Sequence, residues 1–289
     1  MENMITKGIR KSLKIRPSGR SSDFISPSFG WGCLYDCSYC YMKRHKPEGL
    51  SIATNTYQIL TEINTHAIFA KSEVKKPNQT HSQYITYDIS CNEDFALHLK
   101  HHDWKEIFNF FKAHDDIMAT FATKYVNPKL LEYNPEEKIR IRFSMMPEEK
   151  RKLHEPNTSS IIERIKAVDK FKKAGYEVHL NFSPIIVYKG WLDDYEELFE
   201  LINNNIEDKD NVFAECIFLT HNANKHFRNS HKHPRTELDL WKPEFQEAKI
   251  SEYGGKNIRY KRELKKQFID AFVKEHDNVI PWNVIRYIF

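Results

Sequence analysis

The sequence is short of several features that would place it in a common class. It has five cysteines in 289 residues, too few for a disulfide-stabilised scaffold. No apolar run approaches the roughly 20 residues that a membrane-spanning helix needs. The first 20 residues lack the apolar core of a secretory signal. Internal repeats and low-complexity tracts are also missing. These absences predict a cytoplasmic protein with no membrane partner.

Composition and charge allow a folded globular protein that is only mildly basic. Hydrophobic residues make up 40% and charged residues 29% of the chain, and the net charge is +4. The positive charge is concentrated in residues 7–16 (KGIRKSLKIR) and 256–266 (KNIRYKRELKK). Such runs are typical of surfaces that follow a phosphate backbone. A solvated helix face explains them equally well, so charge alone leaves nucleic-acid binding open.

Three cysteines carry the clearest signal for chemistry. Cys33, Cys37 and Cys40 have the spacing C-x3-C-x2-C within GWGCLYDCSYCYMK. Three thiolates on one loop hold three irons of a [4Fe–4S] cube, which leaves the fourth iron open for a small molecule. A zinc site would want a fourth ligand near paired C-x2-C knuckles, and the sequence has no second knuckle. At this motif the chain resembles radical S-adenosylmethionine (SAM) enzymes, in which the open iron binds SAM.

Strand-like and helix-like segments alternate along the chain. We expect strands just before the cysteine motif and at residues 84–90, 117–123, 139–144, 177–183 and 212–219, with helices at 55–71, 102–114, 159–174 and 192–206. Thr158 or Ser159 is expected to cap the helix over 159–174, which ends at Gly175. The alternation predicts an α/β fold, a partial (βα)6 barrel of the TIM type. Residues 1–28 would form a basic lead, and 29–289 the barrel with a C-terminal hairpin, helix and strand.

The carboxyl ends of the expected strands carry polar side chains. In parallel barrels these ends meet on one rim, where the loops that hold the active site converge. The rim would therefore gather a thiol, an amine and several hydroxyls beside the cysteine motif: Cys91, Lys124, Ser144, Ser183 and Thr220 with His221.

Several further segments resemble the spore photoproduct lyase family, radical SAM enzymes that repair a UV-induced thymine dimer. The similar segments are CLYDCSYCY, ISCNEDFALHL, FATKY, IRFSMM, HEPNTSSIIERIKA, KKAGYEVHLNFSPI, the pair Gly190 and Trp191, and the ending IRYIF. They follow the family's order with similar spacing and cover nearly the whole chain after about residue 28.

The resemblance implies a role for individual residues. Cys33, Cys37 and Cys40 would bind the [4Fe–4S] cluster; Lys124, Ser144, Ser183 and Tyr39 would contact SAM; Cys91 would donate a hydrogen atom to the product radical; and Tyr41, with Tyr39 as a second candidate, would return a hydrogen to the thiyl radical. A cationic amine suits the SAM carboxylate, and hydroxyls supply further donors.

The implied activity is a lyase that cleaves SAM to a 5′-deoxyadenosyl radical and reverts a thymine dimer in DNA. Its expected partners are damaged DNA and an electron donor such as flavodoxin or ferredoxin, and we expect a monomer. Glu93 departs from the family, which has a small hydroxyl residue two places after its catalytic cysteine. The alternative is therefore a family member acting on a modified RNA base or a peptide. A non-enzymatic iron–sulfur sensor would gain nothing from an open iron and a nearby thiol.

Other candidate residues receive a structural interpretation. We expect His98, His101 and His102 to face solvent at a helix start, and Cys216 to lie in the core. The histidine-rich segment 221–233 is predicted to be a mobile loop, since its spacing fits no common zinc signature. Glu155 is assigned to a turn without chemistry. The glycine pair in YGGKNIRYK predicts a hairpin, whose flanking Arg259, Lys261 and Arg262 would grip a nucleic-acid backbone.

Overall fold

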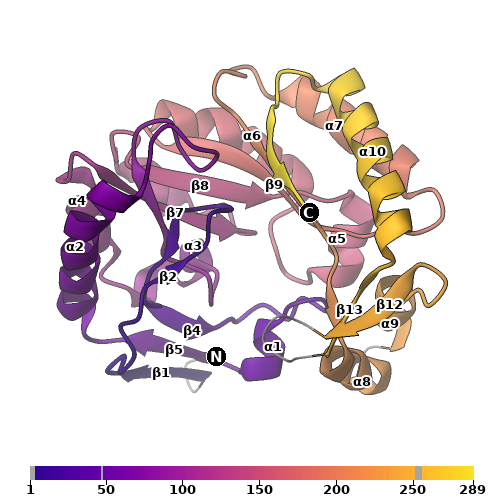
Figure 1. The fold of residues 1–289 in the computed structure, drawn as a ribbon, viewed down its shortest axis with the longest axis horizontal. Coiled ribbons are helices and arrows are strands. Elements are labelled where there is room, and N and C mark those ends of the chain that lie inside the picture. Colours follow the sequence, from indigo (N-terminus) through magenta and orange to yellow (C-terminus); the bar gives the residue numbers. More distant parts are fainter. Residues whose placement is uncertain (1–3, 47, 233, 251–255) are drawn as a thin grey trace.

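A curled eight-stranded sheet forms the centre of the molecule (Figure 1). The computed structural model describes residues 4–46, 48–232, 234–250 and 256–289. In spatial order the strands are β14 (Ile285–Ile288), β10 (Ala214–Phe218), β9 (Glu177–Ile185), β8 (Ile139–Ser144), β7 (Ile117–Thr123), β6 (Ile85–Asp88), β3 (Phe24–Ile25) and β2 (Arg16–Pro17). Neighbouring strands are parallel except for β2 and β3. This open parallel sheet confirms the predicted partial barrel.

The strand that precedes the cysteine motif lies outside the barrel, contrary to expectation. It is β4 (Gly30–Gly32), which pairs antiparallel with β5 (Leu50–Ala53), and β5 pairs in turn with β1 (Ile5–Gly8) in a separate three-stranded sheet. The first parallel strand of the barrel is β3, which ends shortly before Pro27. Proline has no N–H to donate to a ladder, so the chain leaves the main sheet there and reaches the cysteines from a second layer.

Helices cover the outer face of the sheet (Figure 1). The long ones are α2 (Thr56–Glu73), α4 (Trp104–Lys112), α6 (Ile161–Lys173), α7 (Trp191–Asn205) and α10 (Arg262–Val279). The chain also forms the short helices α1 (Met42–His45), which lies beside β4, α3 (Phe95–His98) and α5 (Glu148–His154), with 3₁₀ turns at Leu99–His101 and Pro128–Glu132. Each of the expected helices is present within a few residues. Among the described residues, no helix is both long and apolar enough to cross a membrane.

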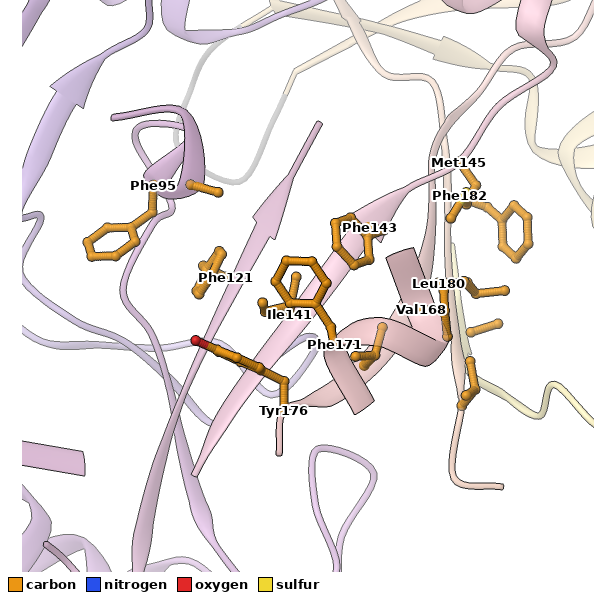
Figure 2. Packing of buried hydrophobic residues seen from close by; sticks show 14 of the residues in the cluster. Phe95, Phe121, Ile141, Phe143, Met145, Val168, Phe171, Tyr176, Leu180 and Phe182 are labelled. Atoms are coloured by element: carbon orange, nitrogen blue, oxygen red, sulfur yellow. The ribbon is translucent and has the colours of Figure 1, made fainter. Parts of the chain in front are cut away.

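Aromatic side chains fill the space between the sheet and its helices. Figure 2 shows Phe121 of β7 and Phe143 of β8 facing Phe171 of α6 and the neighbouring Tyr176. All four are at most 2% exposed, and the Phe143 and Phe171 rings meet edge to face at 5.3 Å. The barrel strands are therefore held from outside by a dry aromatic layer, which leaves their inner faces and carboxyl ends to polar groups.

Helix α6 begins two residues later than the sequence suggested, at Ile161 rather than at residue 159. Its cap is Ser160, whose side chain accepts from the Glu163 N–H while Glu163 accepts from the Ser160 N–H at 2.7 Å. Thr158 and Ser159 are used elsewhere: Thr158 donates to the Glu155 carbonyl, and Ser159 accepts from the Val126 N–H. The predicted helix end is confirmed, because Gly175 follows with a φ of 93°.

A small C-terminal unit follows the barrel strand β10. It consists of β11 (His221–Asn222), α8 (Ala223–Lys232), α9 (Pro234–Leu240), β12 (Gln246–Ile250) and β13 (Lys256–Tyr260). Strands β12 and β13 pair antiparallel, which confirms the hairpin, although its glycine pair lies outside the described residues. The histidine-rich segment is mostly helix α8 rather than a loop. His226 packs on Trp241 and bonds Glu237 of α9, so the helix has partners that its sequence alone did not show.

The cap of α6 gives the first testable prediction. Replacing Ser160 with alanine removes the side-chain half of the capping box and should lower the free energy of unfolding by about 1 kcal/mol. Chemical denaturation of the metal-free protein measures this change. Ser160→Asp, which keeps a capping oxygen, should retain most of the stability. Equal losses in both variants would contradict the assignment of the cap.

Candidate active site

A cavity of about 430 Å³ opens at the carboxyl ends of the barrel strands. Every residue to which the sequence assigned a site role lines it: Cys33, Cys37, Tyr39, Cys40, Tyr41, Cys91, Lys124, Ser144 and Ser183. Thr220 also lines the cavity, whereas the side chain of His221 lies outside the described part of the structure. The parallel topology therefore places the predicted rim residues together, as the strand ends required.

The cysteine loop, residues 33–40, forms one wall of this cavity. Lys43 of α1 donates to the Cys33 carbonyl at 3.0 Å, and the Cys40 N–H donates to the Cys37 carbonyl. Burial raises the pKa of Cys33 to about 12 and that of Cys37 well above its ordinary value. Without a metal these thiols keep their protons, so binding a metal releases protons.

The donor set fits a cluster of several irons better than a single ion. Within the described ranges, no three His, Cys, Asp or Glu side chains converge as the ligands of one metal would. The three cysteines instead all line one cavity, where the charge of Cys40 raises the pKa of both Cys33 and Cys37. Three thiol ligands spaced around a shared cavity suit a [4Fe–4S] cube with one open iron.

Lys124, at the end of β7, stands in a buried group of charges. Its Nζ lies 3.4 Å from Ser144 Oγ and 5.8 Å from the centre of the Tyr39 ring. Burial opposes its charge, but the Glu155 carboxylate, Cys37 and Asp94 together outweigh burial, and the pKa of Lys124 is raised. Glu155 itself accepts from Tyr39 Oη and, at 2.7 Å, from Arg164. Asp94 adds a second carboxylate, since its Oδ2 accepts from the Lys124 N–H at 2.8 Å, so two cations and two anions meet at this side of the cavity.

Cys91 and Tyr41 form a second group of cavity-lining residues. The Tyr41 hydroxyl donates to the Cys91 carbonyl, and Tyr41 Oη lies 3.6 Å from Cys91 Sγ. Burial and the nearby Asp88 carboxylate raise the pKa of Cys91, so its S–H bond stays intact at neutral pH. The two loop tyrosines are thus separated: Tyr41 contacts Cys91, whereas Tyr39 points to Glu155.

Glu93 occupies an environment that the sequence did not indicate. Its carboxylate is 1% exposed, and its Oε2 lies 3.0 Å from His98 Nδ1 and 2.8 Å from His102 Nε2. His98 Nε2 accepts from the Leu34 N–H in the cysteine loop at 3.3 Å. The expectation that His98 and His102 face solvent is therefore wrong, since burying a carboxylate requires donors around it. His101 keeps a partly exposed position.

Glycine at position 30 makes room for this carboxylate. A Cβ built there would lie 2.3 Å from the Glu93 carboxyl group. Any larger residue would therefore push Glu93 away from its histidines. The sequence alone indicated Gly30 and Gly32 only as neighbours of the cysteine motif and did not show that Gly30 makes room for Glu93.

Some cavity residues were missed because only strand ends were considered. Arg142 lies two positions before Ser144 on β8, and Asn181 lies two positions before Ser183 on β9. Residues two apart share one face of a strand, so the alternation pattern was a usable signal. Arg142 bonds Asp88 at 2.6 Å and Glu215 at 3.2 Å. Asn181 Oδ1 is buried without a hydrogen-bond partner among the described atoms.

The basic residues of the hairpin have mixed environments. Arg259 pairs with Glu247 at 3.4 Å, and Lys261 donates to the Glu244 carbonyl at 3.0 Å. Arg262 begins α10 and is exposed. At the other end of the chain, Arg10 stacks over Trp31, 5.4 Å from the ring centre. Exposed cations are thus present near both ends of the chain, at the two positively charged runs of the sequence.

A partial parallel barrel whose strand ends face a C-x3-C-x2-C loop defines a radical SAM enzyme. The family model for spore photoproduct lyase matches residues 2–289. The chain belongs to the spore photoproduct lyase family, and is a lyase that uses a [4Fe–4S] cluster and SAM.

Relatives and solved structures agree with this membership. The chain is 29% identical to spore photoproduct lyase of Bacillus subtilis (strain 168) over 92% of its length and 78% of that protein. It is 28% identical to the Geobacillus sp. (strain Y412MC61) enzyme, covering 83% of this chain and 69% of the relative. A solved spore photoproduct lyase complexed with dinucleoside spore photoproduct has the same fold, with a TM-score of 0.87 and 24% identity over 99% of this chain and 82% of that one.

The buried carboxylate of Glu93 predicts a pH-dependent contribution to stability. Burial alone would raise its pKa, but His102 and His98 lower it from 4.5 to about 2. Between pH 4.5 and pH 2 the unfolded chain therefore binds a proton at Glu93 that the folded chain does not bind. The stabilisation of the fold by ionised Glu93 is complete above pH 4.5 and is lost as the pH falls toward 2. We expect Glu93→Gln to lower the free energy of unfolding at neutral pH by roughly 1.5–3 kcal/mol.

The difference in the free energy of unfolding between Glu93→Gln and wild type should be smaller in acid. Urea unfolding of the metal-free protein at neutral pH and near pH 4 should show a smaller gap at the lower value. Glu132→Gln, at an exposed position, serves as the matched control and should change little at either pH. A gap that is constant with pH would mean that Glu93 is not held as an ionised carboxylate.

Proposed function

We propose that this chain repairs spore photoproduct in DNA, with Cys91 as the hydrogen-atom donor. The observation that carries the proposal is the pairing of Cys91 with Tyr41 in the cavity that also holds Cys33, Cys37 and Cys40. A thiol with an intact S–H bond beside a phenol suits hydrogen-atom transfer. The same thiol would be a poor nucleophile, because its pKa is raised rather than lowered.

The loop cysteines would hold the cluster, and the Lys124 side of the cavity would hold SAM. When bound, these cofactors supply the electron and the 5′-deoxyadenosyl radical that begin the reaction. Lys124 carries the charge that a SAM carboxylate requires, and Ser144 and Ser183 add hydroxyl donors. Tyr39 donates to Glu155, whose carboxylate raises the pKa of Lys124. We therefore assign Tyr39 to the Lys124 side of the cavity rather than to Cys91.

Cys91 would quench the product radical, and Tyr41 would restore the thiol. The contact of 3.6 Å between Tyr41 Oη and Cys91 Sγ is short enough for a hydrogen to pass directly between them. Both side chains line the same cavity as Lys124, so the lesion would meet the site of hydrogen abstraction and the donor within one cavity. This shared cavity supports two transfer steps at one substrate.

Binding of damaged DNA rests on charge and on exposed strands. The basic lead, the hairpin β12–β13 and the start of α10 present exposed cations that suit phosphates, such as Lys249 and Arg262. Solved relatives hold the dinucleoside spore photoproduct, and we extend that substrate to this chain. Reaching a thymine pair inside a duplex costs a few kcal/mol of unstacking.

The remaining partners follow from the chemistry. A flavodoxin or ferredoxin would reduce the cluster, and the complete cavity within one chain supports a monomer. Five free cysteines and an oxygen-sensitive cluster suit a reducing compartment, so we propose a cytoplasmic location.

The decisive experiment supplies the lesion itself. After anaerobic reconstitution, the protein should convert a dinucleotide spore photoproduct to the thymine dinucleotide when given SAM and reductant. Cys33→Ala should lose the cluster absorption and all activity. Formation of 5′-deoxyadenosine without release of the thymine dinucleotide would overturn the substrate and leave the radical SAM class standing. A modified RNA base or a peptide would then be the next substrates to assay.

The role of Cys91 can be tested separately from cofactor binding. Cys91→Ala should retain cluster absorption and SAM cleavage, while the product radical is diverted from the thymine dinucleotide to adducts. Cys216→Ala is the matched control, because Cys216 is a buried core thiol on β10 away from the loop cysteines. Mass spectrometry of the products distinguishes the two. Clean thymine dinucleotide from Cys91→Ala would remove Cys91 from the mechanism.

A further inference from the structure

A chain of hydrogen bonds connects the cysteine loop to the C-terminal unit. Ser38, which lies between the ligands Cys37 and Cys40, has its Oγ 2.7 Å from His154 Nδ1. His154 Nε2 lies 2.9 Å from Asp239 Oδ2 on α9. The Ser38 N–H also donates to the His154 carbonyl at 3.0 Å, so the loop is attached to His154 by main chain and side chain.

The bonding pattern fixes the direction of each hydrogen bond. Lys150 donates to both oxygens of Asp239, at 3.0 and 2.7 Å. Burial raises the pKa of Asp239, but the bonds from His154 and Lys150 outweigh it and lower the pKa to about 2. An ionised carboxylate only accepts, so His154 Nε2 carries a hydrogen, and Nδ1 is left to bond the Ser38 hydroxyl.

The middle of this chain is rigid. The His154 side chain is 0% exposed and lies at the end of α5, immediately before Glu155. These consecutive residues hold consecutive loop residues, since His154 bonds Ser38 and Glu155 bonds Tyr39. The turn after α5 therefore sets the position of the loop, and Asp239 sets the orientation of the His154 ring.

Asp239 belongs to the part of the chain that leads to the basic hairpin. Helix α9 is followed by β12, and Glu237 of the same helix bonds His226 of α8. Gln246 of β12 donates to the Leu240 carbonyl of α9 at 3.0 Å, so a shift of α9 would be transmitted to the hairpin that carries Arg259. His154 is the point at which such a shift reaches the cysteine loop.

We propose that Asp239, acting through His154 and Ser38, is a positioning residue for the cysteine loop. Seating of the C-terminal unit on a nucleic acid is thereby coupled to the placement of the cluster and its open iron. The coupling to nucleic acid rests on the proposed function, whereas the mechanical link from Asp239 to Ser38 does not.

Hydrogen exchange of the anaerobically reconstituted full chain tests the link without any substrate. Asp239→Ala and Ser38→Ala should each speed amide exchange in peptides covering residues 33–41 by about tenfold, as expected for losing one hydrogen bond within a charged network. The double variant should exchange no faster than either single variant, because both remove the same connection. Asp270→Ala, an exposed acidic position on α10, is the control for charge and should not change the loop.

A spectroscopic readout separates positioning from simple loss of structure. Iron content should be unchanged in Ser38→Ala, since all three cysteines remain, while the EPR signal of the reduced cluster and its response to SAM should shift. Ser38→Thr keeps the hydroxyl and should restore the wild-type spectrum. This pair decides the question even if Asp239→Ala fails to fold. Identical spectra for Ser38→Ala and wild type, or additive exchange in the double variant, would overturn the link.

The second arm adds a dinucleotide spore photoproduct. In wild type it should slow exchange both in the hairpin and in residues 33–41, and in Asp239→Ala it should protect the hairpin alone. Protection of the hairpin without the loop in wild type would overturn the coupling. No protection of either segment would count against the proposed substrate, while the link would still be decided by the substrate-free comparison.

Discussion

The buried ion pair between Glu155 and Arg164 holds the active side of this molecule together. The two groups meet at 2.7 Å and both side chains are 0% exposed. Arg164 also donates to the Ser144 carbonyl at 2.8 Å, and Glu155 accepts from Tyr39. The Glu155–Arg164 ion pair therefore connects the end of β8, helix α6 and the cysteine loop. Removing one partner of such a pair leaves an uncompensated charge, which costs roughly 3–5 kcal/mol, so its members are fixed as a unit.

This pair also explains why Lys124 is charged where burial opposes it. Arg164 is satisfied by Glu155, by Ser144 and by Thr158, so it contributes little free charge to the cavity. The Lys124 amine lies near the Ser144 hydroxyl, and its charge lowers the pKa of the nearby Cys37 thiol. The arrangement suits anionic groups, both thiolates and a carboxylate. The protein thus provides the electrostatic counterpart of the cofactors before they bind.

Much of this architecture was predictable because it follows from local pattern. β7 and β8 begin and end where β-branched and aromatic runs do, and parallel strands fix which end carries Cys91 and Lys124. Burial of His98 and the link from Ser38 to Asp239 were not predictable. Each depends on groups from distant segments that meet only after folding, and a lone histidine in sequence gives no sign of its partner. Motif resemblance found residues that line the cavity and missed those that bond the cysteine loop to the rest of the fold.

The proposed function asks the same side chain to serve two opposite purposes within one cavity. The loop cysteines would lose their protons to bind iron, whereas Cys91 would keep its hydrogen until a radical reaches it. Burial raises the pKa of both kinds, so burial does not separate them. Charged neighbours do not separate them either, because the Glu155 carboxylate raises the pKa of Cys37 more than the Lys124 amine lowers it, and the Asp88 carboxylate raises the pKa of Cys91. The cluster itself would separate them: iron would replace the protons of the three motif thiols, whereas Cys91 lies outside the motif and would keep its S–H bond.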